Sequence, residues 1–507
     1  MGVMRFLVYP PESVLAWPEV FDGYLSAADG RVFPTEIEVT GNLLACRRSV
    51  SDSGRLHVAW PVEGYGRPVI STASLPEREE PYLLLLELAR GKIAQLRDQI
   101  SAWEVGGMTI PEAFQAPYQE ASRKFREATA LQDQPHRLAE LCKQSLARAF
   151  EAADIAVKSY AGQRLAARRK RSPQPPAALG CSLGQYLPGS DLGLAFREPF
   201  AAAIVPVEWK HVASAAGDAH WDLADAQLEW ALANRLFVSG GPLLDLSVDG
   251  MPAWLGSWGS DLPNLQSVVC DYVETAVGRY AGRIRHWNVC ARANTGGAFG
   301  LSEENRLWLV ARALEVVRQV DDEVQVMIRV DQPWGEYQGR GSHRLAPLQF
   351  VDALLRAGIG LSAVDLEIAI GFRQRGSAPR DLLELSRLLD LWSILGIPLY
   401  VTLACPSQPV AADAKATGGI EIEQGRWKRE WSEAAQADWI DELIPVLMAK
   451  QSIVGIFWMH LSDGVQHEFP HAGLMRPEGT LKPALARFAE HRRSLVKTDS
   501  DPSIRSC

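Results

Sequence analysis

The stretch that decides the fold is Pro263–Asn294, which reads PNLQSVVCDYVETAVGRYAGRIRHWNVCARAN. Apolar residues recur at spacings of three and four over Leu265–Tyr280, which predicts an amphipathic helix with one apolar face. Gly278 and Gly282 end that helix. Ile284–Cys290 then predicts a short buried strand, so the stretch contains one helix followed by one strand of an α/β protein.

The polar residues that follow this strand point to a functional site. Arg292 and Asn294 come directly after the predicted strand. In a (β/α)₈ barrel, the residues just past the carboxyl end of a strand line the active site. We therefore expect Arg292 and Asn294 to face the site, whatever its chemistry.

Working outward from this stretch, strands and helices alternate over residues 177–494. Eight such units in about 320 residues predict a (β/α)₈ TIM barrel. The predicted strands are Leu179–Leu183, Ala202–Val207, Pro242–Leu246, Arg285–Cys290, Val324–Val330, Ala363–Ile370, Pro398–Leu403 and Val454–His460.

Two further regions precede the barrel. Residues 1–78 contain short β-type runs separated by Gly, Pro, Ser and Asp, which predicts a small β domain, either carbohydrate-binding-like or a structural cap. Residues 79–172 carry helical patterns and predict a helical segment. The proline-rich linker Ser172–Pro176 separates this segment from the barrel, and the tail 497–507 is expected to be disordered. The helical patterns are Tyr82–Trp103, Pro111–Leu131 and Arg137–Ala167.

Composition excludes several classes of partner. The net charge of −9 argues against nucleic acid or an anionic membrane. The seven cysteines are scattered without a CxxC pair, which favours reduced thiols. No apolar run is long enough to span a bilayer, and the start MGVMRFLVYPPE shows no signal peptide, so we expect a cytoplasmic protein. No cofactor is predicted.

Three motifs carry a resemblance to a known family. Arg279–Arg292 reads RYAGRIRHWNVCAR, Gly455–Asp463 reads GIFWMHLSD, and Gly473–Ala484 reads GLMRPEGTLKPA. Together they resemble glycoside hydrolase family 10, the endo-β-1,4-xylanase family. The resemblance covers the barrel and not the first 172 residues, and it implies a TIM barrel that acts on a β-linked polysaccharide or oligosaccharide of xylan type.

The same resemblance places the family's catalytic positions on residues that cannot do its chemistry. The family motif WDVVNE ends in the general acid/base, and the matching position is Arg292. The family nucleophile lies in T-E-[LI]-D, and the matching residue is Leu403. Lys210 remains as a sugar-hydroxyl donor, and Trp458 precedes Met459, which takes the place of the family's tryptophan. The family reaction in its known form is not supported.

Other polar residues at predicted strand ends could replace the lost groups. Asp331, Trp334 and Glu336 follow one strand and suit sugar binding, although an exposed loop with incidental acids would look the same. Asp245 follows another strand and has the same two interpretations. Glu367 lies within an apolar strand, where it forms either a core ion pair with Arg329 or Arg292 or a displaced catalytic acid.

The last predicted strand ends in a cluster of histidines and acids. His460 and Asp463 are followed by the run 466–471, which reads QHEFPH. Such a cluster can bind a metal, but its spacing matches no zinc motif, so we expect a hydrogen-bonding rim and no metal.

Three hypotheses for function follow. The first is a family 10-like enzyme with relocated acids, of which Glu336 and Glu367 are the best pair. The second is a non-catalytic barrel that binds a carbohydrate through Trp334, Trp458 and the acids. The third is a scaffold whose helical segment 79–172 contacts a protein partner. The sequence favours a sugar-binding mouth over hydrolysis, with an ion pair between Arg292 and the neighbouring acids.

Overall fold

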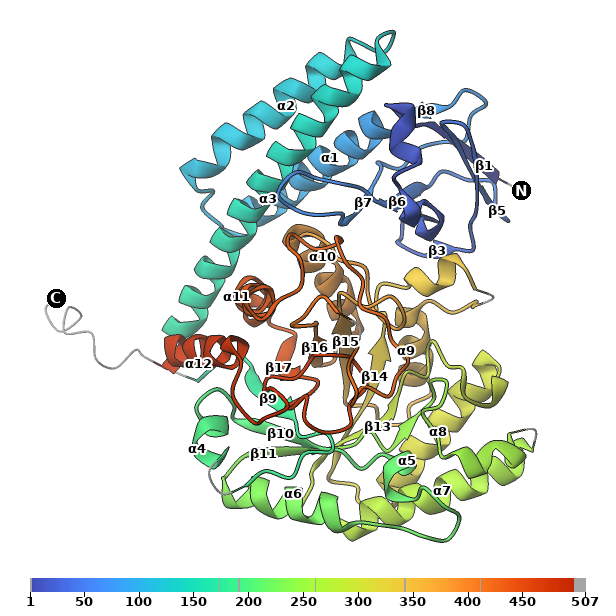
Figure 1. Ribbon diagram of the computed structural model, residues 1–507, viewed down its shortest axis with the longest axis vertical. Coiled ribbons are helices and arrows are strands. Elements are labelled where there is room, and N and C mark those ends of the chain that lie inside the picture. The colour runs from blue at the N-terminus through green and yellow to red at the C-terminus, as the bar shows by residue number, and fades with distance from the viewer. Residues whose placement is uncertain are drawn as a thin grey trace, which may run out of the picture.

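The computed structural model describes residues 2–172, 174–189, 192–259, 261–341, 343–410 and 412–496, and parallel strands form a barrel at its centre (Figure 1). The barrel closes because β17 pairs with β9 and β11 pairs with β13. The predicted (β/α)₈ fold is confirmed. The barrel strands are β9 (Ala178–Ser182), β10 (Ala202–Val205), β11 (Phe237–Gly240), β12 (Leu244–Asp245), β13 (His286–Ala291), β14 (Gln325–Asp331), β15 (Ala363–Ala369), β16 (Leu399–Ala404) and β17 (Ile453–Trp458).

The third strand of the barrel differs from its prediction. Sequence reasoning placed it at Pro242–Leu246, whereas the structure divides it into β11 and β12, which both pair with β13. Gly241 adopts a φ of +101° and Pro242 has no N–H to donate, so the ladder is interrupted between the two halves. The second half ends at Asp245, which brings this carboxylate to the mouth of the barrel.

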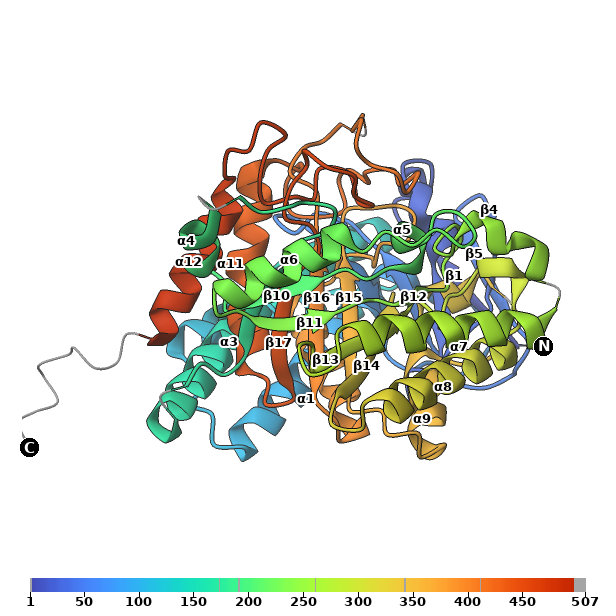
Figure 2. The ribbon, with the colours of Figure 1, turned by 90° about the horizontal axis from the view of Figure 1, so that it is seen from below.

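Helices cover the outside of the barrel (Figure 2). In α8, Leu309, Val310, Ala313, Leu314 and Val317 are buried on one side, and Ser302 caps the first turn by accepting the N–H of Asn305. This amphipathic pattern is what fixes the helix against the strands. The helices are α4 (Leu192–Arg197), α5 (Trp209–Val212), α6 (Asp222–Ala233), α7 (Leu262–Arg279), α8 (Glu303–Val320), α9 (Pro347–Arg356), α10 (Leu382–Trp392), α11 (Glu433–Ala449) and α12 (Pro483–Val496).

Two small sheets form the N-terminal β region. Their inward side chains, among them Phe6, Leu25, Leu44 and Val58, belong to one hydrophobic core. The first sheet has the order β4 (Glu36–Thr40), β5 (Leu43–Arg48), β1 (Gly2–Leu7) and β8 (Tyr82–Leu83); the second has the order β3 (Val32–Phe33), β2 (Tyr24–Ser26), β6 (Arg55–Ala59) and β7 (Val69–Ser71).

This β region rests on loops at the mouth of the barrel. The backbone N–H of Val69 donates to Pro379 O at 2.8 Å, and that of Arg67 donates to Arg426 O at 2.9 Å. The N–H of Thr35 donates to Gly339 O at 2.9 Å. The acceptors lie in the segments that follow β14, β15 and β16, so the β region covers one side of the mouth (Figure 1).

The helical segment contains α1 (Leu84–Val105), α2 (Gln115–Thr129) and α3 (Pro135–Arg171) and lies beside the barrel. Trp103 and Val157 pack in one cluster with Leu383 of α10 and Val446 of α11. In the third hypothesis, this segment contacts a protein partner. The structure shows that part of its apolar surface is already buried against the barrel.

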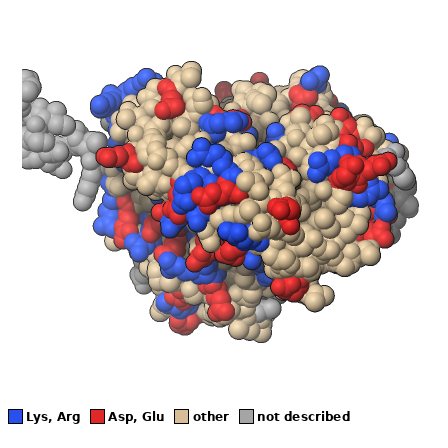
Figure 3. All heavy atoms as spheres, turned by 90° about the horizontal axis from the view of Figure 1, so that it is seen from above, with Lys and Arg blue, Asp and Glu red and all other residues tan. Residues whose placement is uncertain are grey.

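The surface carries charged side chains of both signs. Acidic and basic side chains are interspersed on the face seen in Figure 3. Within the part of the chain that the structure describes, no helix is both long and apolar enough to cross a membrane. The tail 497–507 and Pro173 of the predicted linker lie outside the described residues.

The buried ion pair between Lys92 of α1 and Asp381 yields a stability prediction. The two groups are 2.6 Å apart, their side chains are 2% and 4% exposed, and Asp381 also caps α10 by accepting the N–H of Leu383. Lys92→Met leaves Asp381 buried and unpaired, so the free energy of unfolding should fall by about 3–5 kcal/mol in urea denaturation. Adding Asp381→Ser, which keeps a capping oxygen, should recover part of that loss. A double variant no more stable than Lys92→Met alone would contradict this account.

Candidate functional site

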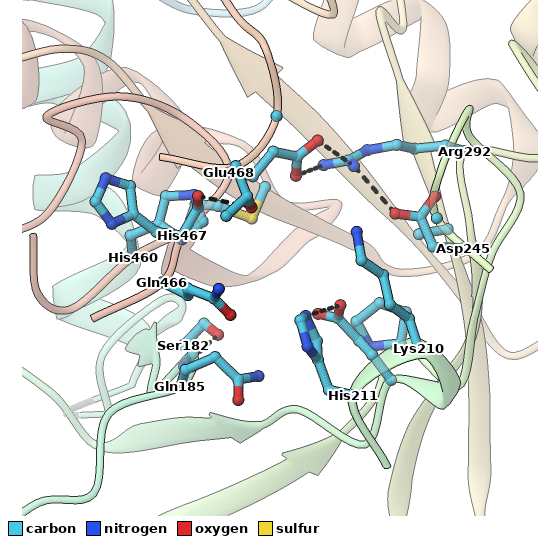
Figure 4. A pocket seen from close by; sticks show the side chains of 18 of the residues that line it. Ser182, Gln185, Lys210, His211, Asp245, Arg292, His460, Gln466, His467 and Glu468 are labelled. Atoms are coloured by element: carbon cyan, nitrogen blue, oxygen red, sulfur yellow. Dashed lines mark hydrogen bonds and ion pairs between the residues drawn. The ribbon is translucent and has the colours of Figure 1, made fainter. Parts of the chain in front are cut away.

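A polar pocket of about 110 Å³ opens at the carboxyl ends of the barrel strands (Figure 4). It is lined by residues that follow several different strands, as expected for the functional face of a TIM barrel. Its polar lining comprises Ser182, Gln185, Glu208, Lys210, His211, Asp245, Asp249, Arg292, Arg329, Arg375, Thr417, His460, Gln466, His467 and Glu468.

Arg292 is the centre of a buried charge cluster on one wall of this pocket. It directly follows β13, and its backbone adopts a φ of +59°. Its guanidinium donates to both oxygens of Glu367, at 3.0–3.2 Å. It also donates to Asp245 Oδ2 at 3.1 Å and to both oxygens of Glu468 at 2.6 Å. Of the two partners that the sequence offered Glu367, Arg329 and Arg292, the structure pairs it with Arg292, and two further carboxylates share the same cation.

The charges in this cluster are unequally distributed among its acids. Burial raises the pKa of Glu367 to about 7, although Arg292 opposes the shift. Burial also acts to raise the pKa of Glu468, but Arg292 and Arg375 outweigh it and lower that pKa to about 2. Arg375 pairs directly with Glu468. Burial and the two guanidinium groups therefore shift the pKa values of these two carboxyl groups in opposite directions.

A second ion pair lies among the neighbouring strands. Arg329 of β14 donates to Asp365 of β15 at 2.7 Å, and the hydroxyl of Thr402 on β16 donates to the same carboxylate at 2.8 Å. All three side chains are buried. Thr402 directly precedes Leu403, the residue that the resemblance assigns to the nucleophile, and the side chain of Leu403 is fully buried in the apolar core.

The opposite wall of the pocket carries accessible hydrogen-bonding groups. Glu208, Lys210 and His211 lie in the segment after β10 and line the pocket. Gln185 and Gln466 face Lys210 and His211 across it (Figure 4). The carboxyl of Glu208 lies 3.5 Å from His211 Nε2. Burial raises the pKa of Glu208, and His211 opposes that shift. An ammonium, an imidazole, a carboxyl and two amides provide both donors and acceptors for a bound molecule.

The cluster of histidines and acids forms a side wall held by its own bonds. Asp413, Asp463 and His467 offer ligand atoms within 4.8 Å of one another. However, Lys482 pairs with Asp463 and donates to Ser407 Oγ, and His467 Nε2 lies 2.9 Å from Asp413 Oδ2. These carboxylates therefore already face a cationic or donating side chain. Of this group, His460, His467 and Glu468 line the pocket, whereas Asp463 is not among the described residues that line it.

Several predicted site residues lie outside the pocket. Glu336 accepts from Arg380 at 2.8 Å and lines a separate cleft, so the structure does not bring Glu336 and Glu367 to one cavity. Asn294 donates to the backbone oxygen of Asp331 at 2.8 Å. Asp331 accepts from Thr295, and burial raises its pKa to about 6 against the effect of Arg292.

The two tryptophans proposed to stack on sugar are core residues. Trp458 is fully buried, and its indole N–H donates to Ala472 O at 2.7 Å. Trp334 is 8% exposed and packs in the barrel core. Neither ring lines the mouth pocket among the residues described there. Trp458 is the last residue of β17 and Trp334 follows β14, and large apolar rings at such positions can be buried in the core as readily as exposed to a ligand, so the sequence pattern alone misplaced them.

Sequence reasoning also missed residues that the pocket uses. Glu208 and His211 stood in a motif from which only Lys210 was selected, and Glu468 lay in the run considered for metal binding. A carboxylate beside a histidine and lysine just past a strand is a signal that could have been followed. Arg375 gave no signal, because its partner Glu468 lies 93 residues away in the chain.

Comparison with known proteins agrees with the architecture. Residues 206–325 match the model of glycosyl hydrolase family 10. The barrel of this chain is therefore similar to that family, as the sequence motifs indicated. A curated relative, endo-1,4-beta-xylanase 3 of Hypocrea jecorina, is 29% identical over 153 residues, which cover 27% of this chain and 43% of the relative. The match thus spans less than half of that relative's length.

Solved structures give the same kind of likeness. Native xylanase 10B from Thermotoga maritima superposes with a TM-score of 0.48 at 14% identity, covering 67% of this chain and 98% of that one. The family 10 structure from Paenibacillus barcinonensis gives a TM-score of 0.48 at 16% identity, covering 65% and 97%. The assignment of the fold rests on the strand order of this chain itself.

Removing Arg292 should strongly destabilise the protein. Arg292→Met leaves Glu367, Asp245 and Glu468 without their shared cation in a buried setting. We expect the free energy of unfolding to fall by at least about 3 kcal/mol in urea denaturation at pH 7. Adding Glu367→Gln removes one of the uncompensated charges and should restore part of the loss. Wild-type stability in Arg292→Met would show that the cluster is not held by this cation.

His460 should make the protein sensitive to acid. Its Nε2 accepts the N–H of Phe469 at 3.3 Å, and burial together with His467 lowers its pKa to about 3. In the unfolded chain the pKa returns to about 6.5, so below that pH the unfolded state binds a proton that the folded state does not. The free energy of unfolding should therefore fall with falling pH, by at most about 1.4 kcal/mol per unit from this group.

The matched variants for this prediction are His460→Gln and His136→Gln. Glutamine at 460 keeps an acceptor for Phe469 but does not titrate, so the slope of stability between pH 6.5 and 4.5 should become shallower. His136 is exposed on α3, and its replacement should leave the slope unchanged. Equal slopes in wild type and His460→Gln would contradict the prediction.

Proposed function

We propose that this protein binds a neutral β-linked oligosaccharide or polysaccharide of xylan type in the mouth pocket. Sugar hydroxyls both donate and accept hydrogen bonds, and the wall formed by Glu208, Lys210 and His211 offers both kinds of group. These residues fall within the segment that matches glycosyl hydrolase family 10, and a curated relative of that segment is an endo-1,4-beta-xylanase.

We further propose that the protein does not hydrolyse the bound sugar by the mechanism that uses two carboxyl groups. Retaining enzymes of this kind use two acids about 5–5.5 Å apart, of which one donates a proton to the leaving oxygen and the other attacks the sugar. The observation that carries the proposal is that Arg292 forms ion pairs with three carboxylates, those of Glu367, Asp245 and Glu468. Glu367 is buried behind this cation and is not among the described residues that line the pocket, so its proton has no direct path to a bound sugar.

Binding of xylopentaose, followed by titration calorimetry, tests the site. Lys210→Ala removes a charged donor from the pocket wall, and a hydrogen bond to a charged group contributes about 1.5–3 kcal/mol. Affinity should therefore fall by about tenfold or more. Lys143→Ala removes an exposed lysine of α3 and should leave affinity unchanged. Equal affinity of wild type and Lys210→Ala would reject the mouth pocket as the binding site.

A parallel assay of reducing-sugar release from xylan tests the absence of hydrolysis. We expect no release above the level of a heat-denatured sample. Glu208 is the acid of the pocket whose pKa burial raises, so Glu208→Gln is the informative variant. Release by the wild type that Glu208→Gln abolishes would overturn the non-catalytic part of the proposal and make Glu208 its general acid.

A further inference from the structure

A second and larger cleft lies between the N-terminal β region and the barrel. Its volume is about 590 Å³, within the range of small-ligand sites. Tyr24 and His57 line it from the β region, while Tyr337, Phe372 and Glu421 line it from segments after β14, β15 and β16. The family match over residues 206–325 contains none of these residues.

The charges around this cleft are paired. Arg67 lies 2.9 Å from Glu19, Arg426 lies 3.2 Å from Glu423, and Arg373 lies 3.5 Å from Glu421. Arg340 pairs with Asp22 across the boundary between barrel and β region. Since each of these guanidinium groups has a carboxylate partner among the described residues, none of the four is an uncompensated charge that would attract an anion. The cleft offers alternating donors and acceptors, which a neutral polyhydroxylated molecule can use at once.

The walls of the cleft also contain unsatisfied polar atoms. Glu19 Oε2, His57 Nδ1, Gln424 Oε1 and Arg426 Nε are buried without a hydrogen-bond partner among the described residues. Buried polar atoms without partners are uncommon and cost free energy. A bound molecule with hydroxyl groups could supply the missing partners.

The cleft and the mouth pocket share a wall. The segment after β15 contributes Arg375 to the pocket and Phe372 and Arg373 to the cleft. The segment between β16 and α11 contributes Gly418 to the pocket and Glu421 to the cleft. An apolar cluster of Phe372, Ile420, Met459 and Phe469 fills the space between the two cavities. Two polar cavities therefore lie side by side and are formed by the same loops.

We propose that the cleft between the β region and the barrel is a second carbohydrate site that takes a neutral oligosaccharide. The proposal rests on the proposed function for the class of ligand, but its residues are separate from those of the mouth pocket. The N-terminal β region thereby contributes to ligand binding by forming one side of this cleft.

The test uses xylopentaose and variants of each cavity in the full-length protein. Arg373→Ala/Glu421→Ala removes an ion pair at the cleft whose side chains are 68% and 61% exposed, so folding should be preserved. Arg356→Ala/Asp352→Ala removes a comparable pair on α9, outside the cleft, and serves as the control. Calorimetry gives the stoichiometry and affinity, and hydrogen exchange locates protection in peptides covering residues 332–341 and 419–426.

We expect two equivalents to bind the wild type and the control, with the second equivalent lost or weakened about tenfold in the cleft variant. Ligand should protect both peptides in the wild type. Unchanged binding in the cleft variant, or protection confined to the mouth pocket, would contradict the assignment of the cleft as a carbohydrate site. Either result would leave the proposed function of the mouth pocket in place. Loss of affinity in the cleft variant but not in Lys210→Ala would overturn the mouth pocket and keep the cleft. A wild type that binds no xylopentaose would overturn both.

Discussion

A single guanidinium, that of Arg292, compensates three carboxylates that arrive from three other segments of the barrel. Glu367 comes from β15, Asp245 from the end of β12, and Glu468 from the segment after β17. Burying any of these acids alone would carry a large desolvation cost. Their shared cation therefore fixes the relative positions of these segments, and the shape of the mouth pocket depends on it.

The fold of the barrel and the charge cluster at its mouth depend on different interactions. The strands and helices depend on apolar contacts such as the buried Tyr280, Trp287 and Trp392, which do not involve the mouth. The ionic network at the mouth is therefore separate from the contacts that hold the barrel together. A carboxylate bonded to Arg292 is held in one position, which makes it a structural partner of that guanidinium.

The sequence predicted the barrel well because its strands and helices are encoded locally. The pattern of apolar residues predicted the bounds of β13 to β17 to within one or two residues of those observed. Each of these buried strands is a short apolar run bounded by polar turns. The third strand was misplaced because Gly241 and Pro242 divide it, and the shorter half at Leu244–Asp245 carried the clearer pattern. The positions of side chains at the mouth were harder to predict, because they depend on pairs such as Arg292 and Glu468 that lie 176 residues apart.

The N-terminal β region forms part of a second cleft beside the mouth pocket. It adds Tyr24 and His57 to a cleft whose opposite side is formed by the barrel loops. Backbone hydrogen bonds to Gly339, Pro379 and Arg426 hold the β region in place against the segments after β14, β15 and β16. The apolar cluster around Phe372 and Phe469 then separates this cleft from the pocket near Arg292. A broad barrel mouth is thus divided into two polar compartments. The charges near Arg292 hold the first compartment in shape, and the covering β region forms one wall of the second.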